Sequence, residues 1–120
     1  MKRDLKKGYF EINFTENQVE MEYIKIPKNI NINYSDIIHL RYTRQKSGSF
    51  NIMSYQENGK IKKVVFFTVA DHDGYINFLK WMREKNNNIA FDAYPPDGYM
   101  EYKIQENFGF KYRKFLKNSL

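Results

Sequence analysis

Residues 60–82, KIKKVVFFTVADHDGYINFLKWM, decide the fold, because the spacing of the apolar residues changes within this stretch. Its first half, Lys60 to Val69, has a strand pattern in which the central residues, Val64 to Phe67, are apolar on both faces. A strand of that kind is typical of the middle of a sheet, where both faces are covered. The first half therefore predicts a central strand.

The second half of the stretch has the spacing of a helix. Four apolar residues fall at i, i+3, i+4 and i+7, on one side of a helix: Tyr75, Phe78, Leu79 and Met82. Asp71 or Asp73 can cap its start by accepting backbone N–H bonds, and the asparagines at 86–88 favour its end. The pattern predicts an amphipathic helix over about residues 73–86.

Before this stretch, apolar and polar residues alternate, which is the period-two pattern of half-buried strands. Segments of this kind lie at residues 9–14, 18–23, 30–34, 38–43 and 50–55. Ser35 and Asp36 lie between the third and fourth segments. There they predict a bend or bulge in one continuous strand, or its division into two strands. Asn58-Gly59 is the strongest turn signal in the chain, since it favours the positive φ angles of a tight hairpin.

After the helix the pattern is less regular. Residues 94–98, YPPDG, predict a turn, and Tyr99 to Ile104 a short strand. We expect an α+β fold, an antiparallel sheet or partly open barrel followed by a capping helix. The predicted core spans residues 1–88, and residues 89–120 form an irregular C-terminal extension that docks on the core, reaches a partner or frays.

Three features together resemble the pleckstrin-homology-like domains of bacteria: the opening hairpin, the segment INYSDII at 32–38, and the hairpin around Asn58-Gly59 followed by the helix with FLKWM at 78–82. The resemblance implies a sheet of seven strands closed by a helix. The first hairpin turn, Thr15 to Gln18, lacks the basic residues that bind lipid headgroups in such domains. The resemblance therefore does not extend to phosphoinositide binding.

The composition limits the classes of protein and of site. The chain of 120 residues has no cysteine, which excludes disulfides and thiolate metal sites and favours a reducing compartment. No apolar run reaches the roughly 20 residues of a membrane-spanning helix, and the charged N-terminus, MKRDLKKGYF, does not have the pattern of a signal peptide. We expect a cytoplasmic bacterial protein, at most associated with the inner face of a membrane.

The sequence contains no arrangement typical of catalysis or of a cofactor site. His39 and His72 are the two histidines, and their positions give no metal-ligand spacing. Both are expected to be satisfied surface residues, His39 on the polar face of a strand and His72 beside the helix start. No glycine-rich phosphate loop and no nucleophile motif is present, so we expect no cofactor and no enzymatic activity.

Basic residues give two candidate binding regions in a chain with a net charge of +6. If the fold brought two loops together, six residues would form an anion-binding rim: Arg41, Arg44, Lys46, Lys60, Lys62 and Lys63. In the tail, basic and aromatic residues alternate in a way that suits nucleic acid or a partner: Lys111, Tyr112, Arg113, Lys114 and Phe115. A docked amphipathic helix also explains the tail, and an AT-rich genome also explains the excess of lysine.

These observations favour a non-enzymatic interaction module that binds a protein partner through a sheet edge or loop rim. The alternative is binding of nucleic acid or anionic membrane headgroups through the basic loops and tail. Self-association through residues 89–120 is a third expectation, since aromatic segments there could pair between chains.

Overall fold

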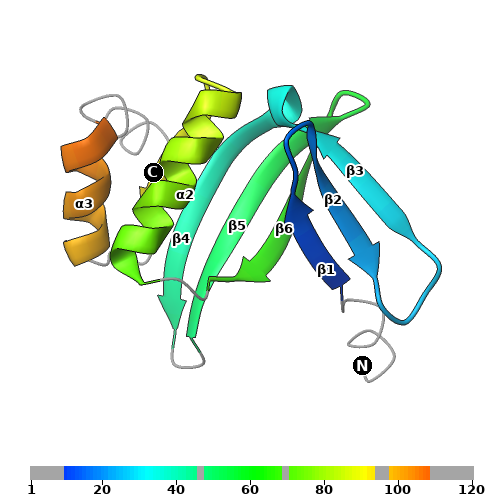
Figure 1. The fold of residues 1–120 in the computed structure, drawn as a ribbon, viewed down its shortest axis with the longest axis horizontal. Helices are drawn as coiled ribbons and strands as arrows, with labels where there is room; N and C mark the ends of the chain where they lie inside the picture. The colour runs from blue at the N-terminus through cyan, green and yellow to red at the C-terminus, as the bar shows by residue number, and fades with distance from the viewer. Residues whose placement is uncertain (1–9, 46–47, 69–70, 94–97, 109–120) are drawn as a thin grey trace. The chain divides into compact units, whose positions relative to one another are not determined.

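The computed structural model describes residues 10–45, 48–68, 71–93 and 98–108. Within them the chain is α+β, with seven strands in two sheets and two α-helices (Figure 1). It divides into two compact units, Met1–Asp36 and Ile37–Leu120. The predicted α+β class is confirmed, and the two sheets are not closed into a barrel.

The first unit is a three-stranded antiparallel sheet in the order β1-β2-β3. Its strands are β1 (Phe10–Phe14), β2 (Gln18–Tyr23) and β3 (Asn29–Asn33), followed by the 3-10 turn η1 (Tyr34–Asp36). Thr15 closes the first hairpin, since its hydroxyl donates to the Gln18 carbonyl at 2.7 Å and accepts from the Gln18 N–H at 3.2 Å. The break predicted at Ser35-Asp36 is confirmed as η1, which ends the third strand.

The two faces of this sheet differ sharply in polarity, as alternation along each strand requires. One face carries the buried residues Val19, Met21 and Ile32. The other carries only amides and carboxylates: Glu11, Asn13, Gln18, Glu20, Glu22, Asn29, Asn31 and Asn33. The sheet therefore presents one apolar and one wholly polar side.

The second unit contains a mixed sheet in the order β6-β5-β4-β7. Its strands are β4 (Ile37–Gln45), β5 (Gly48–Glu57), β6 (Lys60–Phe67) and β7 (Ala90–Ala93). The strands β4, β5 and β6 form an antiparallel meander, whereas β7 pairs parallel to β4. The turn predicted at Asn58-Gly59 is confirmed, with φ angles of 53° and 77° that match a tight hairpin turn.

Helix α2 (His72–Lys85) lies against this sheet beside β4, and α3 (Gly98–Phe108) packs on α2 and β7 (Figure 1). Asp71, one of the two predicted candidates, caps α2 by accepting the Gly74 N–H at 2.7 Å. The helix buries the predicted residues Tyr75, Leu79 and Met82, together with Ile76, and leaves Phe78 half-buried. The Asn86 amide then donates to the Ile37 carbonyl at 3.1 Å, which joins the helix end to the start of β4.

Two predicted elements are wrong. Lys60 to Val69 was predicted as a central, covered strand, but β6 lies at the edge of its sheet and only Val64 is buried along it. Its apolar run instead supplies an exposed face. Residues 99–104, predicted as a strand, belong to helix α3, which buries Met100 and Ile104 at a helical spacing of four.

The extension predicted to be irregular contains regular structure at residues 90–93 and 98–108. Strand β7 is a full member of the sheet, with Phe91, Asp92 and Ala93 all buried. A strand of four residues is too short to give a clear period, and β7 is buried on both faces, so its sequence does not alternate.

Candidate functional site

The predicted anion-binding residues do not form one rim. Arg44 pairs with Ser49 beside the β4–β5 hairpin, whereas Lys60 pairs with Glu57 at the other end of β5. Ser49 and Glu57 are eight residues apart along this strand, which at roughly 3.3 Å per residue separates the two groups by about 25 Å. Anion binding by either group separately stays a prediction.

The remaining members of that set have different surroundings. Arg41 is committed to a buried carboxylate, described below, and Lys62 pairs with Glu57 at 2.5 Å on the protein surface. Lys63 is exposed in the middle of β6. Lys46 lies outside the described residues, as does the whole predicted tail site at residues 111–115.

Strand β6 carries the most exposed apolar surface of the second unit's sheet. Ile61, Val65 and Phe67 are 61%, 52% and 64% exposed. They share one side of the strand with Lys63, because side chains alternate along β6. On the same side, Val65 and Phe67 lie opposite Ile52 and Phe50 of β5, so the apolar surface extends over two strands.

The backbone of β6 is unpaired on its outer side within the described residues, since β5 is its single strand neighbour there. Thr68 N–H donates to the Ser49 carbonyl at 2.9 Å, which fixes the phase of the antiparallel ladder. Alternate residues back from Thr68 therefore face β5, and the backbone groups of Ile61, Lys63, Val65 and Phe67 point outward. We call these four residues the β6 edge.

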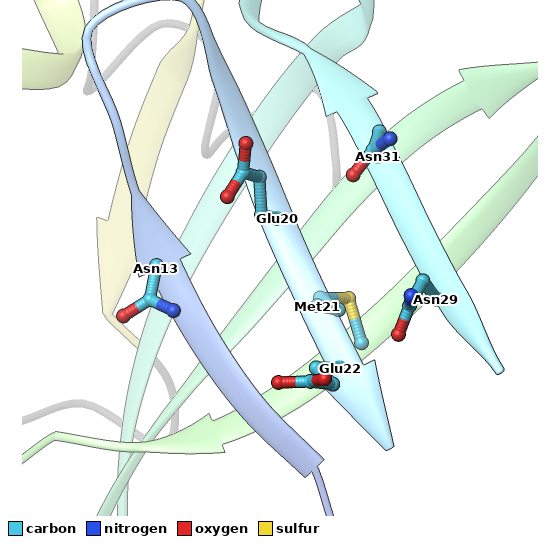
Figure 2. Close-up of a pocket in the computed structure, with 6 residues that line it drawn as sticks. All are labelled: Asn13, Glu20, Met21, Glu22, Asn29 and Asn31. Carbon is cyan, nitrogen blue, oxygen red and sulfur yellow. The ribbon is translucent and has the colours of Figure 1, made fainter. Parts of the chain in front are cut away.

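The first unit has a different candidate feature, an open hollow of about 250 Å³ on its polar sheet face (Figure 2). Asn13, Glu20 and Asn31 are cross-strand partners along one side of it, and Glu22 and Asn29 along the next row. Two carboxylates and three amides dominate the lining, together with Met21. Like-charge repulsion makes this hollow unsuitable for a phosphate.

A buried ion cluster joins β4 to β7 in the second unit. Arg41 donates two hydrogen bonds to Asp92, from Nε to Oδ1 at 2.8 Å and from Nη2 to Oδ2 at 2.7 Å. His39 Nε2 lies 3.0 Å from Asp92 Oδ1. Asp92 is fully buried, and Arg41 faces it as its partner in the parallel register. Bidentate pairing of this kind is geometrically specific and fixes how β7 docks on β4.

The expectation that His39 is a surface residue is therefore wrong, because its side chain is 14% exposed and contacts Asp92. Sequence reasoning also missed Asp92, which has apolar neighbours and belongs to no motif. The sequence feature that could have revealed Asp92 is its carboxylate within the short apolar run IAFDA, residues 89–93, which ends before a predicted turn. A charge inside such a run is rarely buried without a partner.

The surroundings of Asp92 act on its pKa in both directions. Burial raises the pKa of this carboxyl, but the hydrogen bonds and positive charge of Arg41, together with the nearby His39 ring, outweigh burial and hold the pKa below its usual range. A group with a lowered folded-state pKa stabilises the fold above its unfolded pKa, and this stabilisation is lost as the pH falls through that range.

We therefore expect the free energy of unfolding to decrease as the pH falls below about 4, and to do so less steeply in an Asp92→Asn variant. Urea unfolding at a series of pH values measures this. Asp73→Asn is the control, because the pKa of Asp73 is also lowered, by Lys103 in α3, but this carboxyl is exposed. If the free energy of unfolding of the Asp92→Asn variant and of the unaltered protein depended equally on pH, Asp92 would not be the source of the acid-side loss of stability.

His72, the other histidine, begins α2, and its ring contacts Tyr99 of α3 edge-on at 4.7 Å between centroids. Tyr42 also lies near it, at 6.5 Å. Its role here is packing between the helices. Among the residues that the structure describes, no group of three or more His, Asp or Glu side chains is arranged to hold a metal ion.

Comparison of the chain with models of protein families, with curated proteins and with solved structures finds no match in any of the three. None of the helices in the described ranges has the length and apolar character needed to cross a membrane.

Proposed function

We propose that this chain is a non-enzymatic interaction module that binds a partner protein at the β6 edge. The observation that carries the proposal is the coincidence, on one strand, of outward-pointing backbone groups and exposed apolar side chains at Ile61, Val65 and Phe67. An extended segment that pairs with such an edge gains main-chain hydrogen bonds, and alternate side chains give specificity.

An exposed edge with three large apolar side chains is also a liability, because it favours unwanted pairing with other chains. A surface of this kind has a cost in solubility unless it is covered in use. The lysines of β6 reduce nonspecific pairing without covering the apolar residues. This combination suits a surface that is kept soluble until a partner binds.

The proposal fits the resemblance to bacterial pleckstrin-homology-like domains. That this chain belongs to that family stays a prediction, as do its bacterial origin and its cytoplasmic location. The second candidate function is binding of nucleic acid or anionic membranes. It is favoured by Lys60, Lys62 and Lys63, which lie within four residues of one exposed strand. Such binding must weaken steeply as salt rises, because it releases counterions.

Capture experiments with matched variants test the choice. We expect the immobilised chain to retain protein from a native extract, and a Val65→Lys, Phe67→Lys variant to lose the same bands. Ile24→Lys is the control, because Ile24 is 59% exposed and lies outside β6. Titration with single-stranded oligonucleotide and anionic vesicles at two salt concentrations measures the rival. The proposal would be overturned if the β6 substitutions left the retained protein bands unchanged, or if the chain bound only the anionic probes and did so in a salt-sensitive way.

A further inference from the structure

We propose that the segment bound at the β6 edge is an extended, acidic and apolar stretch of a partner protein, in which Glu or Asp alternates with β-branched or aromatic residues. This inference rests on the proposed function and adds the chemistry of the partner. Three properties of β6 carry it: the direction of its backbone groups, the order of its outward side chains and its charge.

The backbone sets the geometry of the bound segment. The β6 edge offers the N–H and C=O groups of four alternate residues along one line, as the Thr68–Ser49 hydrogen bond fixes. A segment that satisfies them must itself be extended, because only a strand presents groups at the matching spacing. A helix laid along this edge would leave these groups unpaired.

The side chains set where the bound segment is apolar. Along the exposed face the order is Ile61, Lys63, Val65, Phe67, so a cross-strand neighbour meets apolar, basic, apolar and apolar positions. Aromatic and β-branched cross-strand pairs stabilise a sheet. Phe67 already stacks on Phe50 at 4.8 Å between ring centroids, which gives the apolar end a broad contact surface.

The charge sets the sign of the polar positions. Side chains alternate along a strand, so a segment of this pattern turns its apolar residues to one face of the sheet and its carboxylates to the other. With the apolar residues on the side of the β6 edge, the carboxylates lie on the face where β6 carries Lys60 and Lys62. Lys62 has Glu57 as a partner at the protein surface, and Lys60 lies near the hairpin. Opposite charges directly across strands are favourable and like charges unfavourable, so carboxylates are the complement of this strand.

A second copy of the chain is a poorer occupant. Pairing of two β6 edges would bring six lysines onto two adjacent strands, three from each copy. Each copy also carries a net charge of +6, which opposes association at low salt. An acidic segment meets neither penalty.

Synthetic peptides provide the probe. A fluorescein-labelled peptide of eight residues, the length of β6, alternates valine and glutamate. Its controls are the same peptide with lysine in place of glutamate, and one of the same composition whose two residue types are grouped rather than alternating. By fluorescence anisotropy at low salt we expect the alternating acidic peptide to bind about tenfold more tightly than either control.

Variants of the intact chain locate the contact. Replacing both Lys60 and Lys62 by Glu is expected to weaken binding of the acidic peptide and to strengthen binding of the lysine peptide, by about threefold to fivefold each, because these two lysines share the face of the peptide's charged residues. Lys63→Pro removes an outward N–H without removing a hydrogen bond to β5, which an edge strand tolerates, and is expected to abolish binding of both. Val65→Lys serves as a second test if the proline variant unfolds by circular dichroism. Ile24→Lys and Tyr102→Lys, at residues 59% and 60% exposed, are controls for exposed apolar positions.

The outcomes separate this inference from the proposed function. Equal or tighter binding of the lysine or grouped peptide overturns the acidic partner but leaves the edge as the site, provided that capture from extract still depends on β6. If light scattering shows a dimer of the chain and a monomer of the Val65→Lys variant, the edge binds a second copy, and the inference is also overturned. Failure of every peptide, with capture independent of β6, overturns both.

Discussion

Replacing Arg41 by Met is expected to lower the free energy of unfolding by about 3 kcal/mol, among the largest effects of any polar substitution in this chain. The reason is that Asp92 is fully buried and accepts two hydrogen bonds from Arg41. Without the guanidinium, a carboxylate remains in the interior with the His39 ring as its remaining polar neighbour. Urea unfolding at neutral pH measures the loss.

The double variant Arg41→Met, Asp92→Leu gives the comparison that isolates the charge. Removing both charges together leaves no uncompensated ion, and apolar replacements of buried ion pairs are often neutral or stabilising. We expect the double variant to recover most of the loss. Lys103→Met, which breaks the exposed pair with Asp73, is expected to change the stability little. An equal loss in Arg41→Met and Lys103→Met would contradict the burial argument.

Replacing Phe91 by Ala is expected to destabilise the second unit by about 3–5 kcal/mol. Phe91 is fully buried in β7, with the Arg83 guanidinium 4.5 Å above its ring centroid and the Phe108 ring edge-on at 4.8 Å. The substitution leaves a cavity where β7, α2 and α3 meet. Thermal or urea unfolding measures this loss.

Phe67→Ala is the matched control, because Phe67 also lies in a strand of the same sheet but is 64% exposed. We expect a much smaller loss there, since little area leaves water. A chain that ends after Asn88, the boundary predicted from the sequence, is expected to lose the second unit's cooperative unfolding, because the buried β7 side of β4 is then uncovered. A cooperative transition of unchanged midpoint in that shorter chain would support the boundary predicted at residue 88 and contradict this expectation.

Local signals in the sequence were sufficient for most of the elements. The hairpin at Asn58-Gly59 and a helix cap at Asp71 or Asp73 were predicted because each depends on a few neighbouring residues; the hairpin is confirmed, and the cap is Asp71. The helix was predicted at 73–86 and found at His72–Lys85, because its apolar stripe repeats over several turns.

The failures concern which strands become neighbours, and this depends on distant residues. The run Val64 to Phe67 predicts burial on both faces, yet β6 is an edge strand. The additional strand β7 pairs with β4, at the opposite side of the meander from β6. Nothing in the local pattern of β6 distinguishes these outcomes. The same holds for the candidate site: the anion rim required two hairpins to converge, and the length of β5 keeps them apart.

The buried polar groups of the second unit were equally beyond local prediction. Asn51 and the Tyr75 hydroxyl are buried side by side between β5 and α2, and the pKa of Tyr75 is raised mainly by burial and then by the charge of Asp92. Asn51 is close enough to oppose that rise slightly, although no pair of their atoms has hydrogen-bond geometry. Such a pair depends on the helix register over the sheet.

The parallel pairing of β7 with β4 also sets an order of assembly. The meander of β4, β5 and β6 needs only short hairpin connections, which close quickly, whereas Arg41 and Asp92 are 51 residues apart in the chain. During synthesis Arg41 therefore leaves the ribosome well before its carboxylate partner exists. Until then the open side of β4 must stay hydrated, so β4 is an edge strand in the newly made chain, whereas in the finished sheet it is paired on both sides.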